Sequence, residues 1–274
     1  MPGKGLKSPS AYPVGFEDAS ARPPAGSGWL DAHHRAKLPE RRAFCRRLAA
    51  LRPASVLDVG CATGLWLEEM DELLPPECEF IGMDSDGAAI AQATQRAKSW
   101  SRRSSFIEFD LNAQLRDLPQ ADLTMLFNVS CYVDDLDEMF GCLARRPGHL
   151  AVRQYDGAAL RFGPMDPEDR VFIEESHRQA VKGRCEFRHY DLDRLYTAIE
   201  RAPFTQRDVS FELFARRSPF PEDCLEYLVG TMWWMFNYLS EEATERLGSW
   251  WSDRQQDPTL PTYFTEVDLC AILA

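Results

Sequence analysis

The sequence predicts an α/β protein with an open, doubly wound sheet and helices on both faces. Short aliphatic segments alternate with helix-forming segments through the first half of the chain. Several of these segments are apolar without interruption, which is the composition of strands buried on both faces. The first one passes through a glycine-rich turn directly into a helix-forming run. Alternation of this kind implies a parallel sheet whose strands are joined by crossover helices.

The first strand and its turn carry the most information. Residues 55–64 read SVLDVGCATG, and the helix-forming run continues from Leu65 to Leu74. This order places backbone N–H groups and a positive helix terminus beside a crevice that suits a nucleotide-like ligand. The spacing is not G-x-G-x-x-G, since Leu65 and Trp66 follow Gly64, and no Gly-Lys-Ser/Thr ending is present. Dinucleotide and triphosphate sites are therefore disfavoured.

The remaining elements follow from the same patterns. A helix is expected from Trp29 to Leu51, interrupted near Pro39. Further strands are expected at 79–84, 105–110, 123–128 and 148–155, with helices at 87–98 and 136–143. The second half predicts a helix at 191–202, an alternating strand at 208–215 and a final strand at 265–274.

Composition divides the chain into an arm and one domain. Residues 1–28 are rich in Pro, Gly, Ser and Ala and predict a mobile N-terminal arm. We expect a single domain over 29–274, comprising a helical lid segment (29–54), a cofactor-binding half (55–160), later helices and a strand (161–220), a helical, aromatic-rich insertion (221–261) and the final strand (262–274).

Charge and cysteine content limit the partners. A net charge of −12 disfavours nucleic acid, whose phosphates need clustered Lys and Arg, and favours a neutral or cationic small molecule. No apolar run is long enough to span a membrane, and no secretory signal is visible. The eight cysteines form no CxxC pair, so we expect reduced cysteines and a cytoplasmic protein. The oligomeric state is left open between monomer and homodimer.

Three acidic residues stand where the first three strands are expected to end. Asp58 lies just before the glycine turn, Asp84 ends the second strand and Asp110 ends the third. The carboxyl ends of parallel strands line one crevice. An acid after the second strand can accept hydrogen bonds from ribose hydroxyls, and one after the third can reach an adenine amino group. This arrangement suits a nucleoside that carries no phosphate.

The motifs VLDVGCATG, GMDSD, EFDL and LFNVS, taken together, resemble those of the class I S-adenosylmethionine-dependent methyltransferases over about residues 55–160. The resemblance implies a Rossmann-like, seven-stranded sheet and S-adenosylmethionine as cofactor, with S-adenosylhomocysteine as product. It implies that the turn passes under the methionine part, that Asp84 holds the ribose, that Asp110 and the Leu111 backbone hold adenine, and that Asn128 lies near the sulfonium. The implied cofactor residues are Asp58, Gly60, Cys61, Ala62, Gly64, Asp84, Ser85, Asp110, Leu111 and Asn128.

One of these positions departs from the family. Ala62 stands where the family usually has glycine. We expect this departure to be minor, since alanine is tolerated there if its φ angle is negative.

The acceptor end is less defined by the sequence. Tyr155 and His33 are the candidate catalytic residues, at the end of the fifth strand and in the lid. The candidate substrate-binding residues are Trp29, His34, Tyr132, Arg153, Asp156, Trp233 and Trp234. Each has a structural alternative: loop hydrogen bonds or ion pairs for the polar residues, an exposed position for the histidines and helix packing for the tryptophans.

Two further clusters have competing interpretations. Arg41, Arg42, Arg46, Arg47 and Arg52 recur at helical spacing, which is typical of a solvated helix face; the alternative is a site for an anion or carboxylate. Adjacent histidines at 33 and 34 point to different helix faces and make a poor metal pair. No metal is expected.

We therefore expect a methyltransferase that acts on a small molecule, such as a specialised metabolite, at a nitrogen or oxygen atom. Such an enzyme works mainly by positioning the acceptor and excluding water. The alternatives are a methyltransferase for protein or peptide side chains, a non-catalytic S-adenosylmethionine-binding protein and a nicotinamide-dependent oxidoreductase.

Overall fold

The computed structural model describes residues 27–157, 159–183 and 192–274. The predicted mobile arm, residues 1–28, lies outside the described residues except for its last two positions, which begin the first helix.

Within the described ranges, eight strands form one sheet in the order β3-β2-β1-β4-β5-β8-β6, with β7 also paired to β8. The strands are β1 (Ser55–Val59), β2 (Glu79–Asp84), β3 (Ser104–Glu108), β4 (Leu123–Phe127), β5 (His149–Tyr155), β6 (Arg161–Gly163), β7 (Arg207–Arg217) and β8 (Tyr263–Leu273). Strands β1 to β5 are parallel, whereas β8 runs antiparallel to β5, β6 and β7. The carboxyl ends of β1, β2, β4 and β5 therefore lie along one edge of the sheet.

The helices are α1 (Ser27–Ala36), α2 (Leu38–Ala49), α3 (Leu65–Asp71), α4 (Gly87–Arg96), α5 (Leu111–Gln114), α6 (Leu136–Leu143), α7 (Pro167–Gly183), α8 (Leu192–Arg201), α9 (Glu222–Phe236) and α10 (Glu241–Gln256). Short 3-10 turns cover Ala97–Ser99, Leu115–Asp117 and Ser130–Tyr132.

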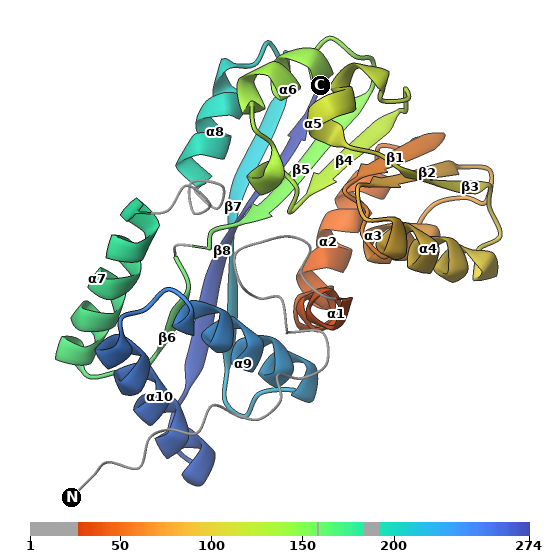
Figure 1. The fold of residues 1–274 in the computed structure, drawn as a ribbon. Helices are drawn as coiled ribbons and strands as arrows, with labels where there is room; N and C mark the ends of the chain where they lie inside the picture. The colour runs from red at the N-terminus through yellow and green to blue at the C-terminus, as the bar shows by residue number, and fades with distance from the viewer. Residues whose placement is uncertain (1–26, 158, 184–191) are drawn as a thin grey trace, which may run out of the picture.

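Helices cover both faces of the parallel part of the sheet (Figure 1). On one face, apolar residues of α6 and α8 such as Met139 and Ile199 pack against the sheet. On the other face, Phe44 and Leu48 of α2 pack with Trp66 and Leu67 of α3. The sheet is thus buried on both faces, which explains why β4 is apolar along its whole length.

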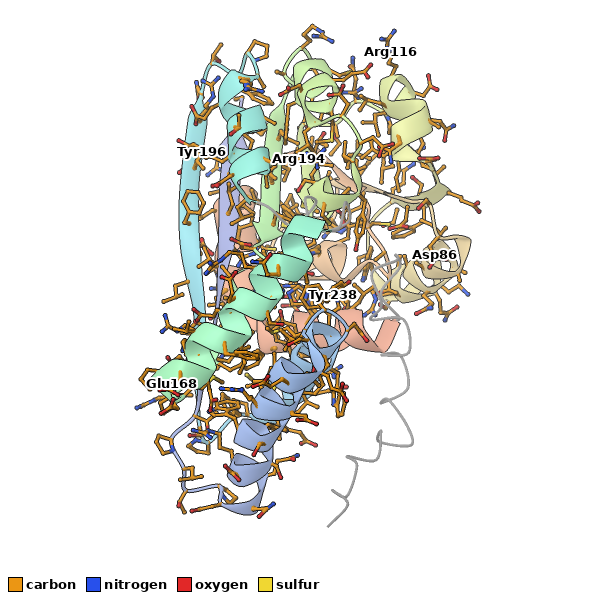
Figure 2. All side chains as sticks on the ribbon, turned by 60° about the vertical axis from the view of Figure 1, so that its left-hand side comes forward. Asp86, Arg116, Glu168, Arg194, Tyr196 and Tyr238 are labelled. Carbon is orange, nitrogen blue, oxygen red and sulfur yellow. The ribbon has the colours of Figure 1, made fainter. Side chains whose placement is uncertain are left out.

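A third core lies beyond the parallel strands, around the first residues of β8. It joins α7, α9 and α10 through side chains such as Ile173, Leu228 and Leu247. Figure 1 shows these helices together around the lower part of the long strands, and Figure 2 shows α7, with Glu168 near its start, beside α10. The aromatic-rich segment before the last strand consists of α9 and α10.

The doubly wound α/β prediction is confirmed, and most element boundaries agree within a few residues. The expected helix 29–51 divides into α1 and α2 at Lys37, close to the interruption expected near Pro39. The last strand, whose direction the sequence left open, runs antiparallel to β5. Two details differ. A three-residue strand, β6, adds an eighth member. Strand β3 ends at Glu108, so Asp110 follows the strand and caps α5 instead of ending the strand.

Candidate functional site

The glycine turn after β1 is held against the end of β2. The N–H groups of Gly60 and Cys61 both donate to the carbonyl oxygen of Met83, at 2.6 and 2.9 Å. Gly60 has a φ angle of 75°, and a Cβ atom added there would overlap Cγ2 of Val129. Only glycine fits, because a side chain at this position would meet both a left-handed backbone and a filled space. The backbone of the turn therefore stays bare.

Ala62 corrects one expectation from the sequence. Its φ angle is +44°, not negative. L-residues other than Gly, Asn and Asp rarely adopt this region, because Cβ comes too close to the backbone. The Ala62 N–H donates to Oδ2 of Asp84 at 2.8 Å, and this hydrogen bond holds the alanine in the unfavourable conformation.

Asp84 connects the turn to the start of α4. While Oδ2 accepts from Ala62, Oδ1 accepts from the N–H of Asp86 at 2.9 Å. Each carboxylate oxygen can accept more than one hydrogen bond, so the half-buried Asp84 keeps capacity for a ligand. Ser85, the next residue, is exposed.

Asp58 is buried beneath the turn without a full set of partners. Its side chain is 1% exposed, and Oδ2 has no hydrogen-bond donor among the residues that the structure describes. Burial, together with the nearby negative charge of Asp84, raises the pKa of Asp58 to about 8. The hydroxyl of Thr63, two positions beyond Cys61, is likewise buried without a described partner. Both groups have capacity for polar groups that the chain itself does not supply.

Replacing Asp58 with asparagine is expected to make stability less dependent on pH. Because the pKa of Asp58 rises from about 4 in the unfolded chain to about 8 in the folded protein, the native state binds the extra proton. Stability conferred by the protonated carboxyl is present below about pH 4 and is lost as the pH rises through 8. Thermal unfolding is measured for both proteins at pH 5 and pH 9. The melting temperature of Asp58→Asn minus that of wild type should be larger at pH 9 than at pH 5. An equal difference at both values, as expected for the exposed control Asp117→Asn, would contradict this prediction.

The predicted adenine and sulfonium residues follow β3 and β4. Oδ1 of Asp110 accepts from the N–H groups of Asn112 and Ala113 at the start of α5, and Leu111 is half-buried. Asn128 has a φ angle of 57°, and its N–H donates to the carbonyl oxygen of Arg153 on β5 at 2.7 Å. The topology brings these segments and the glycine turn to the same edge of the sheet.

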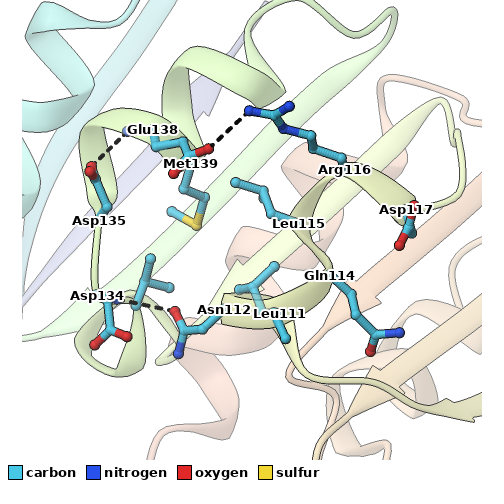
Figure 3. A pocket seen from close by; sticks show the side chains of 12 residues that line it. Leu111, Asn112, Gln114, Leu115, Arg116, Asp117, Asp134, Asp135, Glu138 and Met139 are labelled. Carbon is cyan, nitrogen blue, oxygen red and sulfur yellow. Dashed lines mark hydrogen bonds and ion pairs between the residues drawn. The ribbon is translucent and has the colours of Figure 1, made fainter.

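A hollow of about 410 Å³ lies beside the adenine segment, between α5 and the start of α6 (Figure 3). Leu111, Leu115 and Met139 are among its apolar lining, and Asp134 and Glu138 are among its acidic lining. The glycine turn does not line this hollow. The hollow therefore adjoins the segment predicted to hold adenine, and the glycine turn takes no part in it.

The two predicted catalytic residues lie together at the end of β5. His33 is 3% exposed; its ring packs edge-on against Tyr155, with centroids 5.5 Å apart, and stacks on Tyr227 of α9 at 4.9 Å. Burial, with the positive charges of Arg41 and Lys37, lowers the pKa of His33 well below its usual value. His33 is therefore a neutral imidazole at physiological pH, in an aromatic cluster (His33, Tyr155, Tyr227) that sequence analysis only partly anticipated.

A buried charged network lies next to this cluster, and sequence analysis missed most of it. Lys37, between α1 and α2, is 1% exposed and donates to Glu266 and to Asp268 of β8, the latter at 2.7 Å. Glu266 also accepts a hydrogen bond from the Tyr227 hydroxyl, and Asp268 pairs with Arg153 at 2.5 Å. The only sequence signal was two acids, two positions apart, inside an otherwise apolar final strand.

The network sets the charges of its own members. Burial raises the pKa of Glu266, and the charge of Lys37 offsets only part of this effect. Burial would also raise the pKa of Asp268, but the charges of Lys37 and Arg153 outweigh it and hold that pKa well below the usual range. Arg153, predicted to bind substrate, is here bonded to Asp268 and to Glu212.

His34 faces away from His33, toward α3. Its Nδ1 lies 2.7 Å from Nη1 of Arg41 and its Nε2 lies 3.4 Å from Glu69. Arginine can only donate, so Nδ1 accepts and the proton of His34 is on Nε2. Burial and the charge of Arg41 lower the pKa of His34 to about 3. Arg41 is buried as well, so the interpretation of the arginine cluster as a solvated face is wrong at this position.

The other predicted substrate residues are dispersed. Tyr132 is 40% exposed, and Asp156 is half-buried next to β8. Trp233 packs against Phe236, while Trp234 contacts Tyr238 and His177 of α7. The first contact lies within α9, the second joins α9 to the residues just after it, and the third joins α9 to α7. The side chain of Trp29 lies outside the described residues.

No group of three or more His, Cys, Asp or Glu side chains in the described ranges is placed to hold a metal ion. No helix in the described part of the chain is long and apolar enough to cross a membrane.

Residues 57–146 match a family model described as a methyltransferase domain. The fold is similar to that of phosphoethanolamine N-methyltransferase 2 of Haemonchus contortus, which was solved with phosphomonomethylethanolamine and S-adenosylhomocysteine. The two chains are 13% identical, with a TM-score of 0.51; the likeness covers 90% of this chain and 57% of that one. A putative type II methyltransferase of Anaeromyxobacter dehalogenans is 18% identical, with a TM-score of 0.56 and coverage of 84% and 94%. No curated protein sequence matches the chain significantly.

Proposed function

We propose that this chain is a class I S-adenosylmethionine-dependent methyltransferase that methylates a nitrogen or oxygen atom of a small molecule, such as a specialised metabolite; the methyltransferase-domain model over residues 57–146 supports this. The methyl donor is S-adenosylmethionine. The observation that carries the proposal is the closed acceptor end, where the lid helices α1 and α2 bury His33 against Tyr155 and Tyr227. A macromolecular acceptor would need this end to be open, whereas a small molecule can be enclosed by the lid helices.

The polar groups around the glycine turn fit S-adenosylmethionine. Within the described part of the chain, Asp58 has a buried oxygen without a donor, which suits the ammonium group of the methionine part. Asp84 keeps acceptor capacity for the ribose hydroxyls, and Oδ2 of Asp110 can take the adenine amino group while Oδ1 caps α5. The bare turn at Gly60 lets the ligand approach the backbone closely.

When bound, S-adenosylmethionine would supply a methyl carbon activated by its positive sulfur: the acceptor lone pair would form the new bond as the carbon–sulfur bond breaks, which leaves S-adenosylhomocysteine. The chain then has to hold the acceptor in line and keep water out. We assign the holding of the acceptor to Tyr155 and His33. The low pKa of His33 makes it a weak proton acceptor and suits it to orienting the acceptor through a hydrogen bond. This favours catalysis by positioning and desolvation.

Calorimetric titration with S-adenosylmethionine and S-adenosylhomocysteine, with NADH as the control, tests the cofactor assignment. We expect micromolar binding of both sulfur nucleosides and none of NADH. Transfer of a labelled methyl group is then measured with panels of small amines and phenols, with a peptide mixture and with tRNA. Transfer to peptides or tRNA alone would overturn the small-molecule acceptor and leave the cofactor assignment intact.

Asp84→Asn is expected to weaken S-adenosylhomocysteine binding by about 10- to 100-fold, because charge-assisted hydrogen bonds to the ribose become neutral ones. Asparagine keeps the size of the side chain and one acceptor oxygen, so the turn hydrogen bonds are partly preserved. Asp86→Asn, which alters only the cap of α4, is the matched control. An unchanged affinity of Asp84→Asn would mean that Asp84 does not hold the ribose.

A further inference from the structure

Arg41 of α2 is a buried cation without a counter-ion among the described residues. Its side chain is 4% exposed, and no described carboxylate lies within ion-pair distance of it. Its Nε–H has no hydrogen-bond partner in the described part of the chain. The other arginines of the same cluster that are paired, Arg42 and Arg47, lie on the accessible side of the helix and meet carboxylates there.

The neighbours of Arg41 are neutral or already engaged. Nη1 donates to the uncharged His34, and the guanidinium lies over the ring of Trp66 at 4.6 Å. Behind His34, Glu69 is bonded to Arg42. Asp268 has a stabilising effect on the charge of Arg41 but is itself bonded to Lys37 and Arg153. None of these groups neutralises the guanidinium.

Such an arrangement is costly unless an anion completes it. Removing a charged group from water without a partner costs several kcal/mol. Burial and the nearby charge of Arg153 lower the pKa of Arg41 to about 10, so it still carries its positive charge at neutral pH. A planar guanidinium with free donors is well suited to a carboxylate.

The location of Arg41 indicates which carboxylate this is. Trp66, beneath the guanidinium, is the second residue of α3 and follows the glycine turn directly; its ring also contacts Phe127 at the end of β4. Arg41 therefore lies on the lid side of the turn. Asp58, with its unpartnered oxygen, lies beneath the turn. A buried guanidinium and a buried carboxyl group, both incompletely partnered among the described residues, are complementary to the carboxylate and the ammonium of an amino acid.

We propose that Arg41 binds the carboxylate of the amino-acid end of S-adenosylmethionine, with Asp58 receiving its ammonium group. This proposal rests on the cofactor assignment made above. It explains why a helix of the lid carries a buried arginine: the cofactor supplies the missing counter-ion and draws α2 onto the turn. It also predicts selectivity for nucleosides that carry the amino-acid end.

The test compares S-adenosylhomocysteine with 5′-methylthioadenosine, which keeps the adenine, ribose and sulfur but lacks the amino-acid end. Both are titrated calorimetrically into wild type, Arg41→Gln, Arg41→Lys and Arg46→Gln. Arg46 is an exposed residue of the same helix and controls for the loss of a positive charge. We expect Arg41→Gln to weaken S-adenosylhomocysteine by about 10- to 100-fold, since hydrogen bonds to a charged group are lost. Its affinity for 5′-methylthioadenosine should equal that of wild type.

Arg41→Lys should show an intermediate loss of S-adenosylhomocysteine affinity, because lysine keeps the charge without the paired donors. It also provides the comparison of the two ligands if Arg41→Gln does not fold. Equal weakening of both ligands would indicate a structural role for Arg41 and overturn the proposal. Unchanged S-adenosylhomocysteine affinity would overturn it as well, while leaving the cofactor assignment intact. Only the absence of binding to wild type would contradict that assignment.

Discussion

Replacing Lys37 with alanine is expected to lower the free energy of unfolding by about 3–5 kcal/mol, the usual effect of removing one partner from a buried ion pair. Lys37 is the hydrogen-bond donor that Glu266 and Asp268 share. Without it, Glu266 stays buried with the Tyr227 hydroxyl as its hydrogen-bond donor among the described residues, whereas Asp268 keeps Arg153. Urea denaturation at pH 7 measures the loss, and the exposed Lys98→Ala supplies the control.

The loss should depend on pH. Burial already raises the pKa of Glu266, and removing Lys37 raises it further. In the variant, the folded state then binds a proton that the unfolded chain releases, so its stability falls as the pH rises above the unfolded value of about 4. The additional change Glu266→Gln should recover part of the stability, because a neutral amide replaces the unpaired carboxylate. A loss at pH 7 below about 1 kcal/mol, typical of exposed pairs, would show that the network is not buried in solution.

Gly60→Ala is expected to destabilise the protein by about 2–5 kcal/mol, the sum of a left-handed backbone penalty and overpacking. The φ angle is 75°, and the new methyl group would overlap Cγ2 of Val129. Chemical denaturation measures this effect, and calorimetry should show that the variant no longer binds S-adenosylhomocysteine.

A second glycine supplies the matched control. A methyl group added at Gly248 of α10 meets nothing within 4 Å, so Gly248→Ala should be neutral or stabilising. The double variant Gly60→Ala, Val129→Ala removes the overlap but keeps the backbone penalty, and should recover part of the loss. Equal stabilities of Gly60→Ala and Gly248→Ala would contradict the geometry of the turn.

Local patterns in the sequence were sufficient to predict the parallel half of the fold. The glycine turn, the acids at 58 and 84 and the apolar strands are each defined by neighbouring residues, so their positions follow from the order of elements. The φ angle of Ala62 could not be obtained in this way. It depends on a hydrogen bond to Asp84, which is 22 residues further along the chain.

The surroundings of His33 and Tyr155 were harder to predict because long-range contacts build them. From its own segment alone, Lys37 is expected at the surface, and only its contact with Asp268 of β8 explains why it is buried. Arg41 follows the same helical spacing as its exposed neighbours, so the spacing predicts a solvated position for it. Periodicity reports how residues alternate along one element, not which partner covers that element. For the same reason, the sequence could not show that Trp233 packs against Phe236 and that Trp234 contacts His177 of α7. A substrate role for these two tryptophans stays a prediction.

The Lys37 ion pairs also affect how the protein is made. Lys37 and its two partners are 229 and 231 residues apart in sequence. During synthesis, the segment that carries Lys37 leaves the ribosome long before β8 exists, so for most of translation the lysine has no acid to pair with. Contacts of such high sequence separation form late and slow the folding of a domain. We therefore expect the nascent chain to acquire its parallel strands early, and the helices over the crevice to dock only after β8 has been released.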